Sequence, residues 1–170
     1  METTKTTQEL LKAVAEGVKQ ITAEALIHAQ RAKEAAVRII WMETRLAKDG
    51  ASNTLAANKI GKEVADTYVI AEEAADAAAE ATGIYYQLTQ EYLWEGCSPD
   101  TTEVELNKLL KKATEQMRKA TKRRWLAEEH EHTAQWWYEA TTKQPQGWHS
   151  DIETTSDYII NATDLDPTKL

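Results

Sequence analysis

Apolar and small side chains recur at alternating spacings of three and four residues along the first half of the chain, as on one face of a long amphipathic helix. The first segment carries Leu11, Val14, Val18, Ile21, Ala25, His28, Ala32, Ala35, Ile39, Met42 and Leu46 at these positions. The second carries Ala57, Ile60, Val64, Thr67, Ala71, Ala74, Ala78, Ala81, Tyr85, Leu88 and Tyr92. The pattern predicts two helices, about 5–48 and 53–95, that are separated by a turn at Gly50, with Ser52 or Asn53 as the N-cap of the second.

A third apolar stripe is less regular. It contains Leu106, Leu110, Ala113, Met117, Ala120, Arg124, Ala127, Glu131, Ala134 and Tyr138, so charged residues share the face with apolar ones. We expect a third helix over about 99–142, ended by Pro145 and Gly147. Residues 144–170 form the predicted connector and tail, with a short helix that begins near Ser150.

The spacing and the residue types together predict the fold. The first two segments are rich in alanine and the chain has no phenylalanine, a composition that favours helix over strand. Short turns place consecutive helices side by side in opposite directions. We therefore expect an all-α protein, an elongated antiparallel three-helix bundle formed by residues 1–143, with a short C-terminal helix. The alanines near the middle of each helix predict a thin centre.

Charge and composition argue against several classes of partner and site. The formal net charge of −8 argues against nucleic acid as the partner, because that binding depends on clustered Lys and Arg. A basic run from Lys108 to Arg124 is better explained by pairing with Glu73, Asp76 and Glu80 of the second helix. A single cysteine, Cys97, excludes an intrachain disulfide and a multi-cysteine zinc site. No segment has the length and hydropathy of a membrane span.

Matching the helices end to end places His28 and Arg124 in one polar core layer. Such a layer usually fixes the register of packed helices, and a pH-sensitive switch is the alternative interpretation.

The spacing Glu129-x-x-His132 is the one with which a helix presents two metal ligands on one face. No second motif of this kind accompanies it, so we expect no metal and no cofactor. The chain also lacks a Gly-x-Ser-x-Gly sequence and a glycine-rich phosphate loop. We therefore expect a protein that is not an enzyme. An enzymatic alternative rests on a metal at Glu129 and His132.

Tryptophans gather near one predicted pole of the bundle. Trp41 lies near the end of the first helix, Trp136 and Trp137 near the end of the third, and Trp148 in the connector. Three consecutive aromatic residues at 136–138 cannot all face one core, and partly exposed tryptophans anchor protein interfaces. These four tryptophans are the expected ligand-binding residues. Asn161-Ala-Thr163 is the candidate N-glycosylation site.

Two long alanine-rich helices joined by a tight turn, followed by a third helix and a tail, resemble trypanosome surface proteins of the three-helix-bundle group. This group includes the glutamic acid/alanine-rich protein, the haptoglobin-haemoglobin receptor, invariant surface proteins and variant surface glycoprotein N-terminal domains. The stretch 65–80 is most similar in texture. The resemblance implies a cell-surface glycoprotein or receptor ectodomain, attached to the membrane only through an anchor outside this chain, and a protein ligand such as a host protein.

The expected function is therefore a non-enzymatic cell-surface ectodomain that binds a ligand or coats the surface. The alternative is an intracellular, cytoplasmic helical scaffold that binds partner helices or self-associates.

Overall fold

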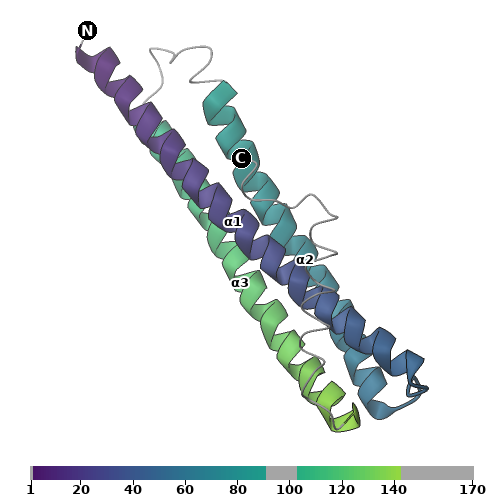
Figure 1. The fold of residues 1–170 in the computed structure, drawn as a ribbon. Coiled ribbons are helices and arrows are strands. Elements are labelled where there is room, and N and C mark those ends of the chain that lie inside the picture. The colour runs from purple at the N-terminus through teal and green to yellow at the C-terminus, as the bar shows by residue number, and fades with distance from the viewer. Residues whose placement is uncertain (1, 91–102, 143–170) are drawn as a thin grey trace.

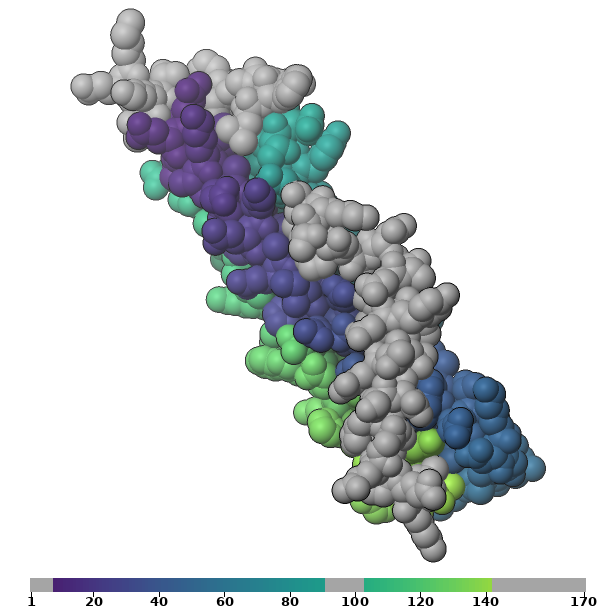
Figure 2. Space-filling view, in the orientation of Figure 1, coloured from purple at the N-terminus to yellow at the C-terminus, as the bar shows by residue number. Residues whose placement is uncertain are grey.

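Three long helices make up the described part of the chain. The computed structural model describes residues 2–90 and 103–142. These residues form α1 (Glu2–Lys48), α2 (Leu55–Gln87) and α3 (Glu103–Thr142), and contain no strand. Each helix packs against the other two along an elongated molecule (Figures 1 and 2). At 1.5 Å per residue, α1 alone is about 70 Å long. The prediction of an all-helical bundle is confirmed.

Contacts between side chains show the direction in which each pair of helices runs. Thr22 of α1 donates a hydrogen bond of 3.2 Å to the carbonyl oxygen of Ala81, whereas Gly61 faces the carboxylate of Glu43. Residue numbers therefore rise along α1 as they fall along α2.

The position of α3 follows from two further contacts with α1. His28 meets Arg124, and Arg38 meets Glu131. Residue numbers thus rise together along these two helices, as the ribbon in Figure 1 also shows.

The turn between α1 and α2 is built around Gly50, which has a φ angle of 75°. This left-handed conformation favours glycine. The amide of Gly50 donates to the carbonyl of Ala47 at 3.2 Å, and the amide of Ala51 donates to that of Leu46 at 2.9 Å. These two bonds form a Schellman motif, which satisfies carbonyl groups at the end of α1.

The N-cap of α2 is Thr54, so the prediction of Ser52 or Asn53 is wrong. The Thr54 hydroxyl accepts a hydrogen bond of 3.2 Å from the amide of Ala57 and donates one of 2.8 Å to the carbonyl of Ala51. Because the turn uses residues 51–54 to reverse the chain, the first residue with its hydroxyl at the helix start is Thr54. Helix α2 accordingly begins at Leu55.

The core consists of three clusters that follow one another along the bundle. The central cluster is almost entirely alanine, with Ile70 as its one larger buried member. The cluster near the α1–α2 turn contains Ile39, Met42, Leu46, Ile60, Ala134 and Tyr138. The cluster at the opposite end contains Leu11, Val14, Ala15, Val18, Leu88, Leu106 and Ala113. Large side chains thus fill both ends, while small side chains fill the centre.

Helix α3 contributes less apolar surface to this core than α1 does. Its buried apolar residues up to position 134 occur once in seven: Leu106, Ala113, Ala120, Ala127 and Ala134. A second series on the inner face, four residues after each of the first four of these, is partly exposed: Leu110, Met117, Arg124 and Glu131. Polar groups therefore share the interface between α3 and its neighbours, in line with the mixed third stripe.

Several predicted features lie outside the described residues. They are the end of the second predicted helix at 91–95, the start of the third at 99–102, and the connector and tail at 144–170 with their short helix. Residues 88–90 continue α2 as a single π-helical turn. Within residues 2–90 and 103–142, no helix has an apolar stretch long enough to cross a membrane.

Candidate functional site

His28 and Arg124 meet between α1 and α3. Arg124 Nη1 lies 3.2 Å from His28 Nδ1. Because a guanidinium has only donors, the imidazole must accept this bond at an unprotonated Nδ1. Arg124 is also held by Glu128, whose Oε1 is 2.9 Å from Arg124 Nε. The side chains of His28 and Arg124 are both partly exposed, so this polar layer lies at the edge of the core.

The environment of His28 disfavours its protonated form. Burial lowers the pKa of His28, and the positive charge of Arg124 lowers the same pKa further. Glu24 and Glu128 act in the opposite direction but do not compensate. Neutral His28 is therefore the form that fits the folded protein.

We expect His28→Gln to reduce the acid sensitivity of the fold. The folded pKa lies below the unfolded value of about 6.5, so between the two the unfolded chain binds more protons. The contribution of His28 is therefore complete above that value and declines as the pH falls below it. Melting temperatures at pH 7.5 and pH 5.0 measure the effect. Wild type should lose more stability on acidification than His28→Gln, and His132→Gln should behave like wild type. A drop of the same size in His28→Gln and wild type would contradict the assignment.

A second polar contact joins α1 to α3 nearer the turn. Arg38 binds Glu131 with both ends of its guanidinium, Nε to Oε2 at 2.5 Å and Nη2 to Oε1 at 3.0 Å. Burial lowers the pKa of Arg38, but the hydrogen bonds to Glu131 and the negative charges of Glu131, Glu34 and Glu128 together outweigh burial and raise it. Arg38 thus stays charged, and this two-point contact fixes the relative position of the two helices.

In the part of the chain that the structure describes, one ion pair joins the basic run of α3 to the acidic residues of α2. Arg123 Nε lies 2.7 Å from Glu73 Oε2. Among the described residues, Asp76 and Glu80 form no ion pair with α3, although the sequence places them opposite its basic run. Arg118 and Lys122 are exposed.

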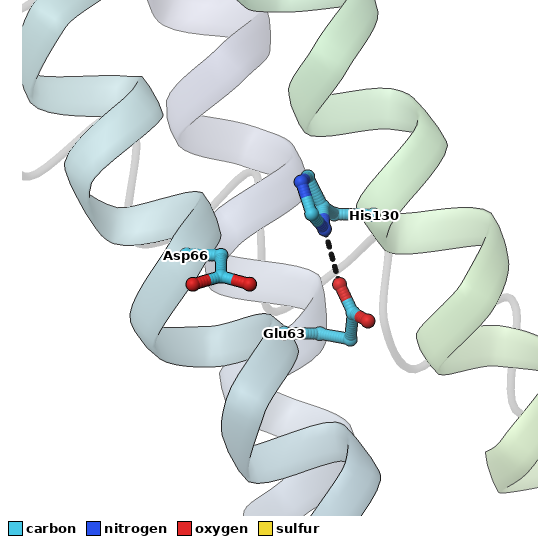
Figure 3. Close-up of side chains that lie close together, drawn as sticks. All are labelled: Glu63, Asp66 and His130. Atoms are coloured by element: carbon cyan, nitrogen blue, oxygen red, sulfur yellow. Dashed lines mark hydrogen bonds and ion pairs between the residues drawn. The ribbon is translucent and has the colours of Figure 1, made fainter.

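A histidine and two carboxylates converge where α2 and α3 pack together. Figure 3 shows His130 of α3 directed at Glu63 of α2, with Asp66 one turn further along α2. His130 Nδ1 and Glu63 Oε2 are in direct hydrogen-bond contact. One potential ligand atom from each of the three residues lies within 4.8 Å of the other two.

The residues of the Glu129-x-x-His132 motif take no part in this cluster. Both side chains are exposed on the outer side of α3. The histidine between them in sequence, His130, is the one that reaches α2. Sequence spacing along one helix singled out residues 129 and 132, whereas the convergence depends on the position of α2.

Two of the tryptophans expected to bind a ligand pack against the core instead. Trp41 and Trp137 are half-buried beside the cluster at the turn end, and the Trp41 ring lies 5.9 Å from that of Tyr138. Trp136 is 62% exposed and its ring makes an edge contact with Trp137. Trp148 and the candidate glycosylation site Asn161 lie outside the described residues.

Sequence analysis missed Trp125, which is 60% exposed on α3. It lies eleven residues before Trp136, a spacing that brings two residues to within about 20° of each other around a helix. The same exposed face, hereafter the outer stripe of α3, comprises Lys111, Glu115, Arg118, Lys122, Trp125, Glu129, His132 and Trp136. The signal was present in the sequence, because Trp125 directly follows the inner-face residue Arg124.

A shallow apolar groove lies between α1 and α2. Its volume is about 320 Å³, and Ile40 and Tyr68, exposed by 40% and 56%, flank a floor of alanines. Lys33 and Glu72 supply its charged groups.

Comparison of the chain with protein-family models, with curated proteins and with solved structures finds no match.

Proposed function

We propose that this protein is a non-enzymatic binding module, the ectodomain of a cell-surface protein, which presents the outer stripe of α3 to a protein ligand. The observation that carries the proposal is the pair Trp125 and Trp136, each at least 60% exposed on one face of one helix. Exposed tryptophans are costly in water and are the residues that most often dominate binding energy at protein interfaces.

The proposed scaffold is an elongated antiparallel three-helix bundle that ends in a short C-terminal helix. The order of contacts between α1, α2 and α3 supports the antiparallel arrangement. On such a scaffold the outer stripe runs about 37 Å along the helix from Lys111 to Trp136. A surface on a packed helix is held rigidly, so little ordering entropy is lost on binding.

The charge of the outer stripe defines the chemistry of the ligand. Lys111, Arg118 and Lys122 are exposed beside the two tryptophans, against two acidic residues, Glu115 and Glu129. The stripe is thus positive on a chain of net charge −8. It suits a protein with an acidic surface and apolar pockets for two indole rings.

The cell-surface location and a host protein as ligand rest on the resemblance to trypanosome surface proteins. Stretches such as 65–80 carry this resemblance through their composition. The cell-surface location and the host-protein ligand are proposed on this basis.

Capture from host serum and from cell lysate, followed by affinity measurement with the captured protein, tests the outer stripe. Trp125→Ala and Trp136→Ala are each expected to weaken binding at least tenfold, because each removes a large anchor. The matched control is Tyr86→Ala, since Tyr86 is 63% exposed on α2. Undiminished binding by both tryptophan variants, or an equal loss in Tyr86→Ala, would contradict the proposal.

The groove between α1 and α2 favours the alternative function, an intracellular scaffold that binds partner helices or self-associates. Its alanine floor and the flanking Ile40 and Tyr68 suit the apolar face of an amphipathic helix. A purified chain that sediments as a stable dimer, and dissociates on Tyr68→Ala, would favour this alternative over the surface module.

A further inference from the structure

We propose that Glu63, Asp66 and His130 form a binding site for a divalent transition-metal ion of the zinc class, which links α2 to α3. The three side chains come from two helices that are far apart in the sequence. Their potential ligand atoms lie within 4.8 Å of one another. Figure 3 shows the three side chains close together between α2 and α3. This site is independent of the outer stripe of α3.

The donor set fits zinc better than magnesium or calcium. One imidazole nitrogen and two carboxylate oxygens are three protein ligands, the number found in zinc sites that keep a fourth position for water. Imidazole suits zinc, copper and nickel, whereas magnesium and calcium take six or more oxygen ligands. His130 is therefore the residue that sets the ion class.

The backbone already places the donors for chelation. Glu63 and Asp66 are three residues apart, which puts both carboxylates on one face of α2. Donor atoms on a tetrahedral zinc are about 3.3 Å apart, given bond lengths near 2.0–2.1 Å. Asp66 is exposed, so rotation about its side-chain bonds is free to shorten the longest separation.

The charge balance of the cluster also favours a cation. No lysine or arginine among the described residues forms an ion pair with Glu63 or Asp66. The side chains of Glu63 and His130 are only 14% and 27% exposed, so water screens the negative charge of Glu63 incompletely. A divalent ion would neutralise the carboxylates of Glu63 and Asp66, for which the imidazole of His130 is the one nitrogen partner in the cluster.

Metal titration of the chelator-treated full chain tests the site. We expect one zinc ion per chain by calorimetry, and an increase in the folding equilibrium constant of about tenfold at a free zinc concentration ten times the Kd. Calcium chloride at the same concentration should leave the melting temperature unchanged. Absence of zinc binding, or an equal response to calcium, would overturn the proposal.

Two variants and two controls locate the ion. Asp66→Asn removes an exposed carboxylate that forms no ion pair, so the fold should persist while zinc affinity falls at least tenfold. His130→Ala should abolish the zinc response. Asp76→Asn, a change at another exposed aspartate of α2, and His132→Ala should both bind zinc like wild type. Wild-type affinity in Asp66→Asn and His130→Ala, or its loss in the controls, would place the ion elsewhere and refute the assignment.

Discussion

Replacing Ile39 with alanine is expected to lower the free energy of unfolding by about 2–5 kcal/mol, the range for removing three buried carbons from a packed core. Ile39 is fully buried in the cluster near the α1–α2 turn, where it packs with Met42, Ile60 and Tyr138. For a chain of this length, the melting temperature should fall by about 5–20 °C.

The neighbouring isoleucine provides the control. Ile40 is 40% exposed, so Ile40→Ala should change stability by less than about 1 kcal/mol. Urea unfolding of both variants measures the difference. Similar losses of stability in the two variants would contradict the orientation of α1 in which Ile39 faces the core and Ile40 faces solvent.

Enlarging an alanine at the centre is expected to be the second most damaging change. Ala78 is 1% exposed and packs in the central cluster, where alanines from all three helices meet. Leucine at this position adds three carbons to a fully buried site surrounded by alanines from neighbouring helices. We expect Ala78→Leu to destabilise the fold by about 1–3 kcal/mol through forced separation of the helices.

Ala79→Leu is the matched control for this substitution. Ala79 is exposed on the adjacent position of α2, and its replacement should change stability by no more than about 0.5 kcal/mol. Thermal unfolding of the pair gives the comparison. A stabilising effect of Ala78→Leu would mean that the centre of the bundle is hollow rather than close-packed.

The large buried side chains of α1 could be predicted from the sequence, whereas five smaller or polar buried residues lie outside the predicted stripe: Ala15, Thr22, Ala29, Glu34 and Ala36. Of its predicted inner positions only Ile21 and His28 are partly exposed. Because the outer side of α1 is polar, only one orientation of this amphipathic helix buries its apolar face in the core. In α2 the same periodicity was less informative, because alanine occupies both faces. The stripe missed Ala56, Ile70 and Ala77, all buried. Alanines on both faces of α2 do not mark the buried side, so the stripe was placed one residue away from Ile70, at Ala71.

The candidate sites were harder to predict than the core. The meeting of His28 with Arg124 follows from matching helix lengths, and end-to-end alignment suffices at that level. The approach of His130 to Glu63 depends on rotation of α3 by a fraction of a turn, which spacing along one helix does not define. The sequence motif consequently directed attention to His132, one half-turn away.

The inner face of α3 has a consequence for the uniqueness of the fold. Its buried alanines repeat every seven residues, so sliding α3 by one heptad would exchange alanine for alanine over most of its length. Apolar contacts alone would tolerate such misaligned states. The alternate inner position differs at each heptad: a slide in one direction brings Tyr138 to the place of Glu131, and the other brings Arg124 towards Arg38. The partly exposed polar pairs between α1 and α3 therefore fix the register of α3. They disfavour the shifted registers that alanine packing alone would permit.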